Sequence, residues 1–242
     1  MPDAKQIPKQ ILLPLEARRP DRFEDFVTGE NAAVLDTMQK LASSGGHCLF
    51  LSGPAGSGKT HLLNAACNRA SQQDRQAFYI APGRLPEQAA AGLADLDHMD
   101  LVCVDDIDLC AGQRSWEEAL FHCFNHLREQ GGSLLASSST PLSALNFSLP
   151  DLASRLAWGL RLQLHPLDDQ GKAEVMQRWA TAHDMQLPED VQNYLLNRGS
   201  RNLPALLKRL EALRQAALSA KRKITVPLAR EVLQSASAED RL

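Results

Sequence analysis

The chain has 242 residues, of which 44% are hydrophobic and 23% charged, a composition typical of a globular protein with a sizeable core. No apolar run approaches the ~20 residues of a membrane-spanning helix, and the first residues lack the apolar core of a secretory signal. We therefore expect a cytoplasmic protein with no membrane partner. The net charge of −3 excludes a global basic field that would attract nucleic acid.

In chain order, the predicted elements begin with an arm and continue with alternating strands and helices. Residues 1–22 carry four prolines and no clean hydrophobic period, so we expect an extended, flexible arm. Apolar residues at helical spacing predict a helix over 30–43. Five apolar stretches then predict strands at 47–52, 76–81, 101–105, 133–137 and 160–164, with helices at 59–72, 84–92 and 115–130. This alternation predicts an α/β fold with a five-stranded parallel sheet and helices on both faces.

The strand signal stops after Pro166, and the remaining segments are helical in pattern. These predicted helices cover 168–184, 188–197, 203–220 and 226–235. We therefore expect three parts: the arm over 1–22, the α/β core over 23–166, and a small all-helical subdomain over 167–242.

The segment GPAGSGKT matches the phosphate-loop pattern G-x-x-x-x-G-K-[ST] at every required position, between a predicted strand and a predicted helix. Its glycines let successive N–H groups face a phosphate, and the helix adds its positive end. Lys59 supplies a charge to the β/γ oxygens, and the Thr60 hydroxyl can bind Mg²⁺. An ordinary glycine-rich turn is the alternative, but the flanking elements favour a nucleotide site. We predict that this site comprises Gly53, Pro54, Ala55, Gly56, Ser57, Gly58, Lys59, Thr60 and His61.

Two aspartates end the third predicted strand, in the segment LVCVDDID. We expect Asp105 to hold Mg²⁺, largely through water, since hard cations prefer carboxylate oxygens. Asp106 could orient the attacking water, or it could cap the following turn, as aspartates often do.

The segment SLLASSSTP places three serines just beyond the fourth predicted strand. In a sheet of this type that strand lies between the phosphate-loop strand and the Asp105 strand. A polar residue at its tip could touch the γ-phosphate or the attacking water, and Ser138 is our candidate. Three turn-forming serines before Pro141 are an equally good interpretation.

Together these segments resemble the AAA+ ATPases, and finer features resemble the DnaA family, from about residue 23 to 235. FEDFVTGENAAV (23–34) is similar to that family's segment near the nucleotide base, which implies that Val27 and Asn31 contact the nucleotide. EEALFHCFNHL (117–127) is similar to the family's helix after the Asp-Asp strand. LASRLAWG (152–159) resembles the stretch with the arginine finger, which falls on Arg155. GSRNLPALLKRL (199–210) resembles the helix of the lid subdomain with the second sensor arginine, which falls on Arg201.

The sequence ends at Leu242, so we expect it to lack the helix-turn-helix DNA reader that follows the DnaA lid. An initiator-like core without this reader resembles the Hda-like branch of the family, to which LPDLASRLAWG (149–159) is especially close. That branch carries a short N-terminal peptide, Q-L-x-L-P-L, that docks on the DNA polymerase sliding clamp. Here the matching residues are Gln10, Ile11, Leu12, Leu13, Pro14 and Leu15. From composition alone, an arm packed on its own core is an equal alternative.

The resemblance implies a regulator that binds ADP or ATP with Mg²⁺, reaches DNA indirectly through the clamp, and presents Arg155 to the ATP of DnaA. Pairing of Arg155 with Asp151 is the structural alternative for this arginine. A homo-oligomer could raise affinity for the clamp by avidity. Two other functions stay open: a helicase loader of the DnaC or IstB kind, which usually has a larger N-terminal module, and a self-contained ATPase that uses its own Asp106.

Overall fold

The computed structural model describes residues 21–96, 98–198 and 200–239. The predicted clamp-binding peptide, residues 10–15, lies outside the described residues, as does most of the predicted arm. None of the helices among the described residues is long and apolar enough to span a membrane.

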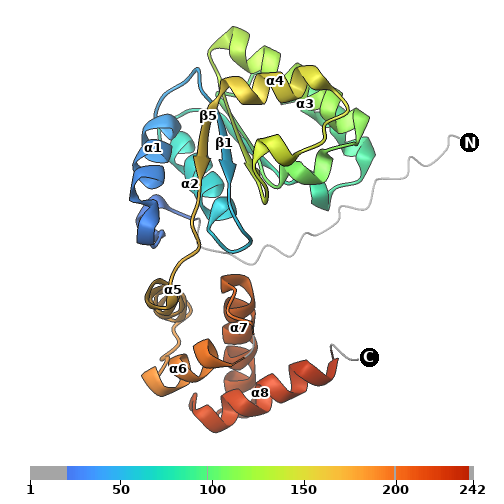
Figure 1. The fold of residues 1–242 in the computed structure, drawn as a ribbon. Helices are drawn as coiled ribbons and strands as arrows, with labels where there is room; N and C mark the ends of the chain where they lie inside the picture. Colours follow the sequence, from blue (N-terminus) through green and yellow to red (C-terminus); the bar gives the residue numbers. More distant parts are fainter. Residues whose placement is uncertain (1–20, 97, 199, 240–242) are drawn as a thin grey trace, which may run out of the picture.

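The core is a parallel sheet of five strands in the order β2-β3-β4-β1-β5 (Figure 1). The strands are β1 (Cys48–Ser52), β2 (Ala77–Ile80), β3 (Leu101–Val104), β4 (Ser133–Ser138) and β5 (Leu160–Gln163). The predicted α/β class is therefore confirmed, and β4 lies between β1 and β3 as expected. Ser52 pairs with Ser138, and Val104 pairs with Ala136, so the phosphate loop and both polar strand ends meet at the carboxyl edge.

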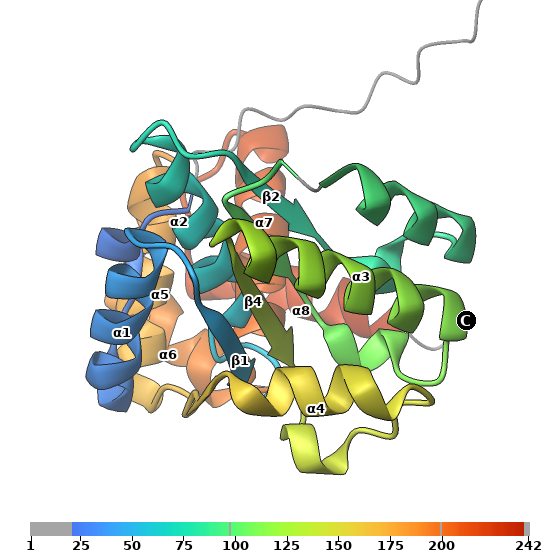
Figure 2. The same ribbon diagram turned by 90° about the horizontal axis from the view of Figure 1, so that it is seen from above.

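Two helices cover each face of the sheet, because alternate residues of the buried strands are apolar on both faces. One face packs against α1 (Ala32–Ala42) and α2 (Lys59–Ser71), and the other against α3 (Arg114–Gln130) and α4 (Pro150–Trp158) (Figure 2). Short 3-10 segments complete the core: η1 (Phe23–Asp25), η2 (Gly29–Asn31), η3 (Pro82–Arg84), η4 (Glu87–Leu96), η5 (Ile107–Cys110) and η6 (Leu142–Ala144).

Four helices follow the sheet and pack around an apolar core of their own. They are α5 (Asp169–Ala182), α6 (Glu189–Asn197), α7 (Leu203–Ala220) and α8 (Val226–Glu239). The side chains of Asp168 and Asn202 cap α5 and α7 by accepting backbone N–H groups at 2.7 and 2.8 Å. This helical lid lies at the carboxyl end of β1, and the amino end of α7 points toward the core (Figure 1).

Two local predictions differ from the structure. The helix predicted at 84–92 is the 3-10 segment η4, whose buried residues Ala90, Leu93 and Leu96 follow the three-residue period of that helix type. Residues 150–158 form α4, a helix that the sequence analysis did not assign, although Pro150 stands in its first turn.

Candidate nucleotide-binding site

The predicted phosphate loop leaves β1 after Ser52 and enters α2 at Lys59. Gly56 and Gly58 have φ of 81° and 98°, a left-handed conformation that residues other than glycine disfavour. Each glycine also meets a close neighbour. A Cβ at Gly56 would lie 2.4 Å from Pro204 Cδ, and one at Gly58 would lie 2.5 Å from Phe26 Cε2. The loop is therefore enclosed by the first turn of α7 on one side and by the segment before α1 on the other.

The polar groups of this loop fit a phosphate ligand. The Lys59 side chain is buried, and its Nζ donates to the carbonyl oxygens of Gly53 and Pro54 at 2.8 and 3.3 Å. The hydroxyl of Ser57 is also buried, and it has no hydrogen-bond partner among the described residues. A buried hydroxyl without a partner is costly unless a ligand or water contacts it. The amino end of α2 and one ammonium group thus stand beside an unsatisfied donor, a combination suited to a polyphosphate.

Asp105 is fully buried and is surrounded by hydroxyl groups from three elements. Thr60 and Tyr79 donate to its Oδ2 at 2.6 and 2.7 Å, and Ser137 donates to its Oδ1. The pKa of Tyr79 is raised, mainly by burial and secondly by the hydrogen bond to Asp105, so the phenol remains a donor. Thr60 and Asp105 thus place two oxygen atoms, the type of ligand that Mg²⁺ prefers, side by side. Sequence reasoning missed Tyr79 and Ser137, because both contacts depend on how neighbouring strands align.

Asp106 follows directly, in a left-handed conformation with φ of 50°. Its N–H donates to Ser137 Oγ at 3.0 Å, so Ser137 contacts both aspartates. The pKa of the Asp106 carboxyl is raised, mainly by burial and secondly by the charge of Asp105. The positive charge of Lys59 offsets only part of this rise. Asp106 therefore retains its proton to a higher pH than an ordinary aspartate, which is the direction a general base requires.

Ser138 lies at the same edge but has different contacts. Its carbonyl accepts the N–H of Gly53 at 3.2 Å, and this bond ties the tip of β4 to the start of the phosphate loop. Its hydroxyl accepts the N–H of Thr140 at 3.1 Å. Ser139 donates to Asp108, the acid two positions beyond Asp106. Both hydroxyl groups thus have local partners.

The segment before α1, where Val27 and Asn31 were predicted to meet the base, joins core and lid. Val27 is buried. The Asn31 amide accepts the N–H of His165 at 2.8 Å and donates to its carbonyl at 3.0 Å, which fixes the chain between β5 and the lid. The carbonyl of Glu24 accepts from Arg178 of α5 at 3.2 Å. Asn31 accordingly links the segment before α1 to the connection between β5 and the lid.

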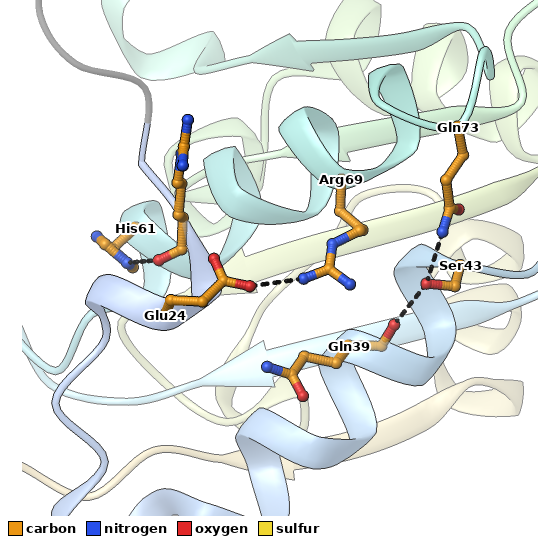
Figure 3. Close-up of polar contacts among 7 residues, drawn as sticks. Glu24, Gln39, Ser43, His61, Arg69 and Gln73 are labelled. Carbon is orange, nitrogen blue, oxygen red and sulfur yellow. Dashed lines mark hydrogen bonds and ion pairs between the residues drawn. The ribbon is translucent and has the colours of Figure 1, made fainter.

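His61 lies on the first turn of α2 and faces this same segment (Figure 3). Its Nε2 is 2.8 Å from the carbonyl oxygen of Arg22, and its Nδ1 is 3.4 Å from Asp21. Burial alone lowers the pKa of His61, but the hydrogen bond and charge of Asp21 outweigh burial, and the net pKa is raised. Figure 3 also shows Glu24 paired with Arg69 of α2, at 2.8 Å.

Arg201 precedes α7 and lies 3.6 Å from Asp169 Oδ2, with both side chains more than half exposed. Two and three residues further along, Leu203 and Pro204 contact Gly56 of the phosphate loop. The predicted sensor arginine therefore belongs to the lid segment that touches the loop.

Arg155 lies far from these groups. Leu160 pairs with Leu49, and a Cβ at Gly159 would be 2.6 Å from the Cys48 carbonyl oxygen, so α4 ends beside the amino end of β1. The Arg155 guanidinium packs on the Trp158 ring at 4.6 Å, and among the described residues it makes no ion pair with Asp151 or any other acid. The structure thus brings the phosphate loop, Asp105, Asp106 and Ser138 together and places Arg155 at the opposite end of the sheet.

Comparisons with known proteins agree with this architecture. The family model of the bacterial DnaA ATPase domain matches residues 18–163, and that of the Hda lid domain matches residues 169–233. Domain III of the replication initiation protein DnaA from Thermotoga maritima is 25% identical, with a TM-score of 0.79, and covers 90% of this chain and 97% of its own.

Two further structures share the fold at lower identity. AMPPCP-bound DnaA from Aquifex aeolicus is 21% identical, with a TM-score of 0.69 over 91% of this chain and 69% of its own. The RuvB Holliday junction branch migration motor of Thermotoga maritima is 19% identical, with a TM-score of 0.65 over 90% and 72%. Since the DnaA model covers more than half of the sequence and the Hda lid model follows it, the chain belongs to the Hda/DnaA-related family of AAA+ ATPases.

Proposed function

We propose that this protein regulates replication initiation by stimulating hydrolysis of the ATP bound to DnaA. In this proposal it binds an adenine nucleotide at its own phosphate loop and the DNA polymerase sliding clamp through residues 10–15, and it supplies Arg155 to the triphosphate on DnaA. The family supports the general role in replication, because both matching models describe DnaA-related parts. The position of Arg155 supports its part in the finer mechanism, and the sequence of residues 10–15 supports the proposed clamp contact.

The nucleotide site supports binding of ADP or ATP. The loop from Gly53 to Thr60 offers backbone N–H groups and Lys59 to the phosphates, and Asp105 with Thr60 would hold Mg²⁺. Bound Mg²⁺ would neutralise part of the phosphate charge. The solved relative from Aquifex holds AMPPCP, an ATP analogue, which agrees with an adenine nucleotide here. Arg201, next to the α7 turn that touches Gly56, is our proposed sensor of the bound nucleotide.

The position of Arg155 is the observation that carries the proposal. Its guanidinium packs toward Trp158, the last residue of α4. Helix α4 ends beside the amino end of β1, whereas the phosphate loop follows the carboxyl end of that strand. The five residues of β1 span about 16 Å at ~3.3 Å per residue, which exceeds the length of an arginine side chain. Arg155 is therefore unsuited to its own triphosphate and suited to that of a second molecule.

An arginine that makes no ion pair within the described part of the chain is ready for such a role. When a γ-phosphoryl group is transferred, negative charge spreads over its oxygens, and a guanidinium can donate two parallel hydrogen bonds to them. For GTPases an arginine supplied in trans increases the rate by about 10³–10⁵. An effect of that size on DnaA would make one side chain of this protein enough for the proposed stimulation.

The leading peptide would bring the two proteins together on replicated DNA. The leucines of residues 10–15 are suitable anchors for an apolar groove, and Pro14 lowers the cost of ordering the peptide. The first described residue of the predicted arm, Asp21, is tied to α2 by Asn64 and Asn68 at 3.1 and 2.7 Å, so the base of the arm is fixed to the core. Self-association could add avidity on a clamp with repeated sites.

The experiment is a phosphate-release assay of ATP-loaded DnaA with DNA-loaded clamp. We expect stimulation by the wild-type chain, its loss in Arg155→Ala, and its loss at low protein concentration when residues 10–15 are replaced by alanine. Excess protein should restore stimulation by the variant of residues 10–15 and not by Arg155→Ala, because the tether raises the local concentration and leaves the chemical step unchanged. Full stimulation by Arg155→Ala would refute the proposal. A pull-down that captures replicative helicase and no clamp would favour a helicase loader instead.

A further inference from the structure

The rotation of α4 about its axis is fixed by its buried face. Leu152 and Leu156 are 1% and 0% exposed and pack into the core under the sheet. Arg155 and Trp158, three positions apart, therefore share the outward face of the helix. The end of α4 is fixed as well, because Gly159 lies against the Cys48 backbone with no space for a side chain. The direction of the Trp158 ring is thus set by the fold and not by a flexible loop.

The neighbouring helix α3 presents two residues to the same place. Phe121 and Arg128 are seven positions apart, two turns along one face of α3. The Arg128 guanidinium carbon lies 5.1 Å from the centre of the Trp158 ring, and that of Arg155 lies 5.8 Å from the centre of the Phe121 ring. With the 4.6 Å contact between Arg155 and Trp158, two cations and two rings form one continuous cluster.

Trp158 is 61% exposed, so hydrophobic burial does not explain its position. An indole face attracts guanidinium groups, and here two of them contact the same ring. Arg128 thereby steadies the ring from α3, while the ring restricts the conformations of Arg155. The restriction matters because a long arginine side chain otherwise loses much rotamer freedom when it binds.

We infer that Trp158 is a positioning residue, which holds the Arg155 guanidinium in place against its ring before the guanidinium meets the triphosphate of the partner. This inference rests on the proposed function of Arg155. Trp158 would act through Arg155 and not by contact with the reacting atoms. Its removal should therefore lower the maximal rate of hydrolysis more than it weakens association with DnaA.

The test measures DnaA-bound ATP hydrolysis, with DNA-loaded clamp, over a range of concentrations of the 242-residue chain. Trp158→Ala should lower the maximal rate by about two- to fivefold, the range of one exposed cation–π contact, with an unchanged half-saturating concentration. Trp158→Phe, which retains a ring face, should recover most of the rate. Leu160→Ala is the matched control, because Leu160 is an exposed apolar residue nearby, 46% exposed, and has no guanidinium contact described. It should behave as wild type.

A second measurement uses the chain alone. The side-chain protons of Arg155 should resonate upfield in NMR spectra because of the Trp158 ring current, and Trp158→Ala should return them to ordinary positions. Absence of this shift in the wild-type protein would overturn the inference. So would a Trp158→Ala variant that changes only the half-saturating concentration, since that result indicates docking. If Arg155→Ala stimulates hydrolysis as wild type does, the proposed function fails, and the inference fails with it. If Arg155→Ala loses stimulation but Trp158→Ala keeps the wild-type rate, only the inference is overturned.

Discussion

Replacement of Glu117 should release the start of the helix that carries Arg155. Glu117 lies on α3, is fully buried, and accepts three backbone N–H groups. Its Oε1 accepts from Gly112 and Ser148 at 2.7 and 3.0 Å, and its Oε2 accepts from Leu149 at 2.7 Å. Since Leu149 is the N-cap position of α4, this one carboxylate holds the entry to that helix.

The free-energy cost of Glu117→Ala can be estimated from these bonds. The N–H of Leu149 is partly buried and would lose its only described acceptor, at a cost of ~1–3 kcal/mol. Gly112 and Ser148 are exposed, so their N–H groups can bind water, at a cost of ~0.5 kcal/mol each. The total is about 2–4 kcal/mol, which at ~2 kcal/mol per molar lowers the urea midpoint by about 1–2 M.

The assay is urea unfolding followed by far-ultraviolet circular dichroism. Glu118→Ala is the control, because its ion pair with Arg114 is at the surface, where the Arg114 side chain is 82% exposed, and should contribute ~1 kcal/mol or less. Glu117→Gln keeps one acceptor oxygen and should fall between wild type and Glu117→Ala. A Glu117→Ala midpoint equal to that of Glu118→Ala would refute the reasoning.

Three further predictions concern the nucleotide site. Gly56→Ala should weaken nucleotide affinity at least about tenfold in a fluorescence titration, because φ at Gly56 is 81° and the added Cβ would clash with the proline of α7. The control Gly92→Ala should leave the affinity unchanged, because the space around Gly92 is open. Asp106→Asn should be more stable than wild type at neutral pH. Because folding raises the pKa of Asp106 above its ordinary value of 3.8, the wild-type protein loses stability as the pH rises from 3.8 through the folded-state pKa. Urea titrations at several pH values should therefore show the difference at neutral pH and no difference in strong acid. Tyr79→Phe should weaken Mg²⁺-dependent nucleotide binding about tenfold by calorimetry, since Asp105 loses one of its three hydroxyl donors; equal affinity would contradict this.

The features that the sequence predicts well are local. The phosphate loop is recognisable because eight consecutive residues carry its chemistry, and its flanking strand and helix follow from hydrophobic period. The parallel sheet follows from the alternation of strand and helix. The position of β4 beside β1 is the one expected for this type of sheet.

The features it misses depend on contacts between distant segments. Adjacent residues of a strand point to opposite faces, so the choice between Ser137 and Ser138 depends on the position of β4 relative to β3. The structure gives the contact with Asp105 to Ser137. The contacts of Tyr79 and Glu117 are hidden for the same reason, because Asp105 is 26 positions from Tyr79, and Ser148 and Leu149 are 31 and 32 positions from Glu117. Two local signals for α4 are present in the sequence: Pro150 in its first turn, and the helical spacing of Leu152 and Leu156.

The account depends most on the claim that Arg155 acts on a triphosphate held by another molecule. The direct measurement is single-turnover hydrolysis of labelled ATP loaded on DnaA, after free nucleotide is removed, in the presence of DNA-loaded clamp. We predict that the wild-type chain increases this rate by at least about 10³, the lower end of the range for arginines supplied in trans, and that Arg155→Lys and Arg155→Ala do not. An Arg155→Ala chain that accelerates DnaA-bound ATP hydrolysis as wild type does would contradict the account.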